Sequence, residues 1–175
     1  MSEVAVARTG ADASDAERFD AFVAARGSAL WRTAWLLTGD RYTAEDLVQT
    51  SLAKAWPKWP GIREEGRFEA YVRRTMFTTY VGWWRRKWNG ERPTDHPPEP
   101  PARAADLEGG QDLVRALAAL PRMQRAVVVC RWFDDLTEAQ TAERLGISTG
   151  TVKSHASRAL ASLRTSPHLT EDRDG

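Results

Sequence analysis

The sequence contains a single cysteine, Cys130, among 175 residues. One thiol excludes an intramolecular disulfide and a zinc site built from several cysteines. Because Cys130 ends the apolar run of residues 126–130, we expect a buried small side chain and not a reactive thiol. No apolar run reaches the roughly 18 residues of a membrane-spanning helix. The N-terminus is polar and acidic, unlike a signal peptide, so we expect a cytoplasmic protein without a membrane segment.

The features of an enzyme active site are also scarce. The three histidines (His96, His155 and His168) are scattered, and no glycine-rich phosphate loop occurs. No pair of acidic residues has a credible partner nucleophile. We therefore expect a protein that is not an enzyme and that needs no metal or cofactor.

Alternation with period two is absent over any useful length, so we expect no strands and an all-α fold. Apolar residues recur instead at helical spacing. They predict a helix from about Phe19 to Thr38, a turn over residues 40–44 with Thr43 as the next N-cap, a helix ending before Pro57, and a third helix from Phe68 to Trp88. Further helices are expected over residues 112–120 and 123–133.

Proline divides the chain. Five prolines fall between Asn89 and Arg103, a density that permits neither a helix nor a central strand and predicts an extended, semi-stiff tether. The expected organisation is therefore two small helical domains. We expect a flexible acidic tail at 1–14, a first lobe at 15–88, the linker at 89–108, a second lobe at 109–166 and a C-terminal tail at 167–175.

The net charge of +1 hides a pattern. Residues 1–20 carry five acids against two arginines, whereas residues 67–92 carry seven bases against two acids. A nucleic-acid binder is recognised by the distribution of its charge and not by the sum.

The segment from Leu136 to His155 has the spacing of a helix-turn-helix. Ala142 is small enough for a second helix to cross it, Gly146 can end the first helix with a positive φ, and Val152 returns to the angle between the two. Ser148 is placed to cap the second helix. The outer face of that helix would carry Thr149, Gly150, Lys153, Ser154, Ser157 and Arg158, short or cationic side chains that allow close approach to bases and phosphates. The alternative is an ordinary solvated helix, which glycine and serine would weaken.

The predicted third helix interleaves aromatic and basic residues, with seven aromatics between Phe68 and Trp88. That number exceeds what one buried stripe can absorb, and exposed rings with cations suit unpaired nucleic acid. Phe68 and Trp83 are expected in the core. For Trp84, Trp88 and the run Arg85-Arg86-Lys87 we expect DNA contact, against the alternative that these rings are buried too.

Three segments, in order, resemble those of bacterial sigma factors. The run AEDLVQTSLAKAW resembles the polymerase-binding region 2.2, and FEAYVRRTMFTTYVGWWRRK resembles regions 2.3 and 2.4. The run LPRMQRAVVVCRWFDDLTEAQTAERLGISTGTVKSHASRALASL resembles region 4. Two lobes and a short linker are similar to the extracytoplasmic-function (ECF) group, closest to its SigE-like subgroup.

The resemblance implies partners and roles. Core RNA polymerase would be contacted at its β′ clamp helices, through Asp46 and Gln49, and at its β flap. The loop from Gly61 to Arg67 would capture an unstacked base of the promoter minus-ten element, and the tether would thread the polymerase interior. The implied minus-ten residues are Ile62, Arg63, Arg67, Tyr80, Trp84, Arg85, Arg86 and Lys87. The implied minus-thirty-five residues are Thr149, Lys153, Ser154, Ser157 and Arg158. His155 stands where family members commonly carry arginine. An anti-sigma partner is left open.

Two other classes compete with this interpretation. A stand-alone helix-turn-helix regulator would bind an operator tightly without polymerase, normally as a symmetric dimer. A helical adaptor that binds only protein would show no dependence on DNA. A sigma factor is expected to bind DNA weakly alone and to direct promoter-specific transcription once core polymerase is added.

Overall fold

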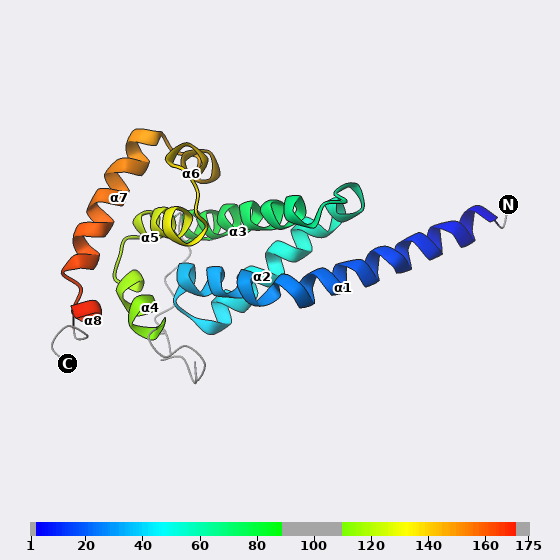
Figure 1. Ribbon diagram of the computed structural model, residues 1–175, viewed down its shortest axis with the longest axis horizontal. Helices are drawn as coiled ribbons and strands as arrows, with labels where there is room; N and C mark the ends of the chain where they lie inside the picture. Colours follow the sequence, from blue (N-terminus) through cyan, green and yellow to red (C-terminus); the bar gives the residue numbers. More distant parts are fainter. Residues whose placement is uncertain (1–2, 89–109, 171–175) are drawn as a thin grey trace.

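The computed structural model describes residues 3–88 and 110–170 (Figure 1). Every element in these two ranges is helical, which confirms the all-α prediction. The elements are α1 (Glu3–Thr38), α2 (Arg41–Ala55), the 3₁₀ helix η1 (Trp56–Gly61), α3 (Glu65–Trp88), α4 (Gly110–Ala118), α5 (Arg122–Val128), the π-helical turn η2 (Val129–Phe133), α6 (Glu138–Leu145), α7 (Thr149–Arg164) and α8 (Pro167–Thr170). The linker predicted at 89–108 lies outside the described residues.

The N-terminal lobe is held together by aromatic side chains from α1, η1 and α3. Phe22, Trp59 and Phe68 are each at most 1% exposed. The Phe68 ring lies 5.0 Å from Phe22 and 4.7 Å from Trp59, both near edge-on, a favoured geometry for aromatic pairs. The Trp59 indole also donates a hydrogen bond to the backbone oxygen of Asp15, 2.9 Å away, which ties η1 to α1.

The beginnings of α1 and α2 correct two predictions. Helix α1 begins at Glu3, so the flexible tail expected over residues 1–14 is wrong from Glu3 onward; that stretch contains no proline to stop a helix. The N-cap of α2 is Asp40 and not Thr43. The Asp40 carboxylate accepts hydrogen bonds from the backbone N–H of Thr43 at 2.8 Å and from its hydroxyl at 2.5 Å. The predicted turn over 40–44 is therefore already the first turn of α2.

The helix-turn-helix is confirmed in its details. Thr137 and Gln140 form a capping box at the start of α6, and Gly146 ends the helix with a φ of 66°. Ser148 caps α7 by accepting a hydrogen bond from the backbone N–H of Thr151 at 3.1 Å. Val152 is fully buried between the helices, as its spacing predicts.

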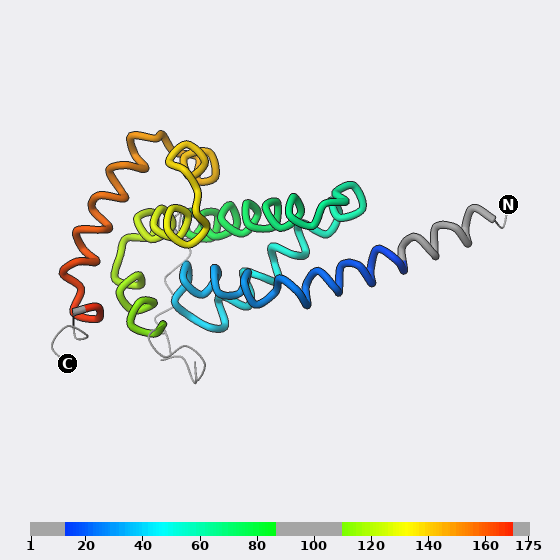
Figure 2. Tube along the Cα trace, in the orientation of Figure 1, coloured from blue at the N-terminus to red at the C-terminus, as the bar shows by residue number. Residues whose placement is uncertain are grey.

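Two further segments of the C-terminal lobe differ from expectation. The helix predicted over 123–133 is α5 followed by η2, whose wider turn ends at Asp134. The C-terminal tail predicted from residue 167 begins instead with α8, which packs against α4 (Figure 2). Ser166, just before α8, is buried, so the segment belongs to the lobe.

The two lobes pack against each other. Helix α1 contacts α4 and α5, and α3 contacts α6, so that one apolar core runs through both lobes (Figure 1). Arg125 of α5 is only 7% exposed and lies across this contact. Its guanidinium donates to the backbone oxygens of Leu37 at 2.5 Å and Leu117 at 2.8 Å. A side chain on Gly39, which ends α1 with a φ of 70°, would meet Arg125 at 3.2 Å.

Candidate nucleic-acid and polymerase interfaces

The recognition helix α7 presents the predicted polar face to solvent. Its exposed side chains include all five residues predicted to contact the minus-thirty-five element: Thr149, Lys153, Ser154, Ser157 and Arg158. The opposite face is fixed in the core through Val152 and Ala159, both fully buried. Because the outer face offers hydroxyls and two cations on a firmly packed helix, it can approach base edges and phosphates together.

His155 sits between these two faces. Its ring is half-buried and its Nδ1 atom is enclosed, without a hydrogen-bond partner among the residues that the structure describes. Burial, and then the nearby charge of Arg158, lowers the pKa of His155 below its ordinary value. A neutral imidazole is thereby favoured near pH 7, and His155 does not replace the cation that an arginine would supply to a phosphate.

The two residues predicted to bind polymerase are exposed on α2. The buried face of this helix carries Leu47, Val48 and Leu52, whereas Asp46 and Gln49 face outward three residues apart. Neither side chain therefore contributes to the core. Exposed residues of this kind on a rigid helix are available to a protein partner.

The loop before α3 is shorter than predicted. The 3₁₀ helix η1 continues to Gly61 and α3 begins at Glu65, which leaves residues 62–64 outside any helix. Ile62 is half-buried and packs against the apolar core, whereas Arg63 and Arg67 are exposed. The chain thus offers two free cations beside a short segment with one anchored apolar side chain.

Helix α3 buries more of its aromatic rings than predicted. Phe68, Phe77 and Tyr80 are buried, because α3 packs against α1 and α2 on one side and against α6 on another. Burial raises the pKa of the Tyr80 hydroxyl, although the charge of Arg125 opposes the shift. With the lobes arranged in this way, Tyr80 is closed to DNA.

The last turns of α3 are more open. Trp84 is half-buried, and Arg85 and Arg86 are exposed. The side chains of Lys87 and Trp88 lie outside those described. The Arg85-Arg86 pair therefore remains available to a phosphate backbone.

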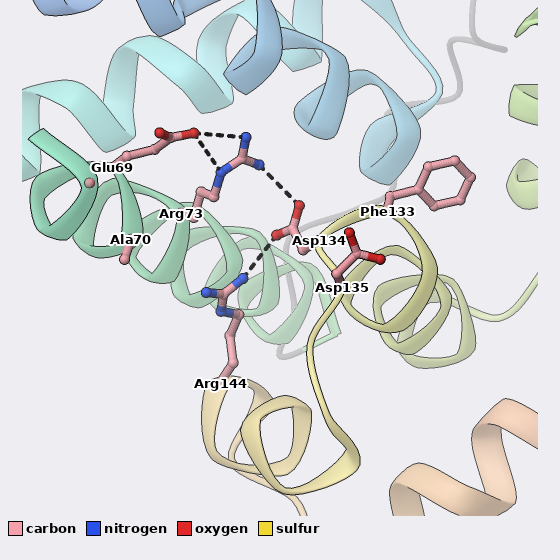
Figure 3. A pocket seen from close by; sticks show the side chains of 8 residues that line it. Glu69, Ala70, Arg73, Phe133, Asp134, Asp135 and Arg144 are labelled. Atoms are coloured by element: carbon pink, nitrogen blue, oxygen red, sulfur yellow. Dashed lines mark hydrogen bonds and ion pairs between the residues drawn. The ribbon is translucent and has the colours of Figure 1, made fainter.

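A cluster of buried charges joins the lobes, and it was not predicted from the sequence. Asp134, between η2 and α6, lies between Arg73 of α3 and Arg144 of α6 (Figure 3). Arg73 Nη1 lies 3.0 Å from Asp134 Oδ1, and Arg144 Nη1 lies 2.9 Å from Asp134 Oδ2. Burial raises the pKa of Asp134, while the two arginines act against the shift. Two adjacent aspartates after an apolar helix look in sequence like a solvated turn, so no local signal marks the cluster.

Two kinds of feature are absent among the described residues. No group of three or more histidine, cysteine or acidic side chains that could hold a metal occurs within 3–88 and 110–170. None of the helices in these ranges has the length and hydropathy of a membrane span. Cys130 is fully buried, as predicted, and burial raises the pKa of its thiol to about 12.

Each lobe matches a known protein family. Residues 22–90 match the family described as Sigma-70 region 2, and residues 116–165 match Sigma-70, region 4. The chain is 40% identical over 148 residues to the RNA polymerase sigma-E factor of Streptomyces coelicolor, covering 83% of this chain and 84% of that protein. It is 32% identical over 169 residues to the ECF RNA polymerase sigma factor SigL of Mycobacterium tuberculosis, covering 89% and 92%.

Solved structures show the same fold. The sigma factor RpoE of Bartonella quintana, crystallised with the anti-sigma factor NepR, aligns with a TM-score of 0.64 and 26% identity, covering 90% of this chain and 99% of that one. CnrH, in complex with the cytosolic domain of CnrY, aligns with a TM-score of 0.58 at 24% identity over 89% and 91% of the two chains, and supports the fold alone. Both sigma regions, in order and at this identity, establish the family: the chain belongs to the ECF group of RNA polymerase sigma factors.

Proposed function

We propose that this protein binds core RNA polymerase through α2 and directs it to promoters that carry a minus-ten and a minus-thirty-five element. The observation that carries the proposal is the recognition helix, whose polar outer face is exposed while its apolar face is buried in a lobe of the sigma region 4 family. The ECF family membership supports the role in transcription initiation. A stand-alone regulator would leave the matching region 2 lobe without a purpose.

The division of labour follows the two lobes. The outer face of α7 reads the minus-thirty-five element, while Arg63, Arg67 and the end of α3 act at the minus-ten element. Initiation by polymerase needs no catalytic group from this chain, and we propose that the protein is not itself an enzyme. The complex of RpoE with NepR supports regulation of this chain by an anti-sigma protein. Its place of action is then the cytoplasm, where polymerase meets the chromosome.

Arg158→Ala tests the minus-thirty-five assignment. If the guanidinium reads a base edge, its loss should weaken promoter binding by about 1–3 kcal/mol and relax preference at one base pair. Polymerase binding should be unchanged, because Arg158 lies on α7, in the lobe that does not contain α2. The measurement is competition between templates with altered minus-thirty-five sequences, using polymerase reconstituted with each variant.

Arg164→Ala is the matched control, since it removes the same exposed charge from the end of the same helix. It should leave the preference among templates unchanged, because Arg164 is not among the residues proposed to read bases. Unchanged discrimination by Arg158→Ala would remove the base-reading role.

The pair Ile62→Gly and Arg63→Ala tests promoter opening. Extruding a base costs a few kcal/mol, which a capture site must offset. The double variant should slow strand opening and relax minus-ten preference, because it removes the anchored side chain and a neighbouring cation. The measurement is permanganate reactivity of minus-ten thymines on a duplex and on a pre-melted bubble.

Lys58→Ala serves as control, because it removes an exposed cation from η1 outside the loop. Rescue of the loop variant by the bubble, with altered base preference, is the expected result. Equal failure on duplex and bubble with every minus-ten sequence would mean that the loop has only a structural role.

A further inference from the structure

One buried carboxylate, that of Asp134, lies at the contact between the lobes, together with the shared apolar core and Arg125. The side chain of Asp134 is only 6% exposed, and those of Arg73 and Arg144 are 17% and 13% exposed. Each arginine reaches a different oxygen of Asp134 (Figure 3). Arg73 belongs to the N-terminal lobe, whereas Arg144 belongs to the C-terminal lobe, so the carboxylate bridges the two. Removing one partner of a buried ion pair leaves the charge of the other partner buried and uncompensated, which is strongly unfavourable.

Each arginine makes a second contact besides the one with Asp134. Arg73 also donates to Glu69 at 3.2 Å and to the Thr33 hydroxyl at 2.7 Å, which fixes its guanidinium against α1. Arg144 lies over the ring of Phe77, with 5.4 Å between its guanidinium carbon and the ring centroid. Because Arg73 is already ordered within its own lobe, closing the lobes costs little further entropy of that side chain. The contact of Arg144 with Phe77 of α3 joins the lobes and adds to the closed arrangement. The cluster is therefore suited to hold one arrangement of the two lobes.

If the protein has the proposed function, the closed lobes cannot contact both promoter elements at the same time. Elements centred near positions −10 and −35 are roughly 25 base pairs, or about 85 Å, apart at 3.4 Å per base pair. Two lobes of this size in direct contact span a much shorter distance than that, since a 100-residue domain has a radius of gyration of only about 13 Å. Asp46 and Gln49, by contrast, are exposed while the lobes are closed.

We propose that the ion cluster of Arg73, Asp134 and Arg144 is an autoinhibitory latch: it keeps the free protein closed, leaves the α2 surface open to polymerase, and must break before the lobes can reach both elements. Polymerase binding through α2 then precedes the separation of the lobes. Of the three residues of the cluster, Arg73 belongs to the N-terminal lobe and the other two to the C-terminal lobe. The ion pair of Arg73 with Asp134 is therefore what joins the lobes.

The test follows the distance between the lobes of the full chain in solution. Dyes are attached to cysteines introduced at Ser28 in α1 and Ser162 in α7, both exposed. Energy transfer is then measured on the free protein and after addition of core polymerase. The wild-type chain should give high transfer that falls when polymerase is added. Arg73→Ala should raise the open-to-closed ratio of the free protein at least about tenfold.

Two further variants separate a latch from a general loss of structure. Arg144→Ala removes the ion pair with Asp134 that lies within the C-terminal lobe. Asp112→Ala is the control: it breaks an exposed ion pair with Arg115, 3.7 Å away, that does not join the lobes. Asp112→Ala should leave the transfer unchanged. Arg73→Ala should open the lobes while its helical circular dichroism stays at the wild-type level; Arg144→Ala should open them as well.

Energy transfer in Arg73→Ala as high as in the wild type would overturn the latch. Wild-type energy transfer that stays high in the presence of saturating core polymerase would overturn it too. The readout on the free protein uses neither polymerase nor DNA. If the variant opens but no form binds polymerase, the proposed function fails and the latch stands; if the wild type binds polymerase but the variant stays closed, the latch fails and the function stands.

Discussion

Replacing Phe68 with alanine is expected to lower the free energy of unfolding of the N-terminal lobe by about 3–5 kcal/mol. The ring is fully buried and lies within 6.0 Å of Phe19, Phe22 and Trp59, measured between ring centroids. Its loss removes apolar burial and leaves a cavity between helices that cannot move together without breaking other contacts. Urea denaturation followed by tryptophan fluorescence measures the effect, since Trp59 reports on the same cluster.

Phe133→Ala is the matched control. The same group is deleted, but the side chain is 41% exposed, and the expected loss is below about 1 kcal/mol. If Phe68→Ala and Phe133→Ala have the same midpoint and slope, the aromatic cluster is not the core that positions α2 and α3.

The double variant Asp46→Ala, Gln49→Ala is expected to lose affinity for core polymerase by at least about tenfold, as the central residues of a protein interface do. Both side chains are exposed, so the fold should persist. The measurement is competition with unlabelled wild-type protein for core polymerase, beside a circular dichroism spectrum that should not change.

Asp20→Ala on α1 controls for charge, since it also removes one exposed carboxylate from the N-terminal lobe. It should compete like the wild type. Normal competition by the Asp46 and Gln49 double variant, with an unchanged spectrum, would place the polymerase surface elsewhere on the chain.

How far the sequence predicts this structure depends on whether a feature is local. The helix-turn-helix follows from Gly146, Ser148 and Val152 because a cap, a positive φ and a buried apolar side chain each depend on nearby residues. The start of α2 shows where local reasoning stops. Asp40 and Thr43 are both good caps, and only the geometry shows that Asp40 accepts from Thr43.

The contact between the lobes could not be predicted from periodicity. Arg73, Arg125 and Asp134 are charged, and charged side chains are expected at the surface. Arg125 is buried because the carbonyls of Leu37 and Leu117 meet it from elements distant in sequence. The same contact explains Tyr80, which was predicted to touch DNA and is buried beside Arg125. Its role at the minus-ten element stays a prediction for a protein whose lobes have separated.

The most direct measurement is run-off transcription with core RNA polymerase on a promoter library, with and without the purified chain. We expect that the chain alone binds these promoters weakly, and that with polymerase it yields transcripts starting at fixed distances from paired minus-ten and minus-thirty-five elements. Tight binding of the chain alone to a symmetric operator, with no promoter-specific transcript when polymerase is added, would contradict this expectation.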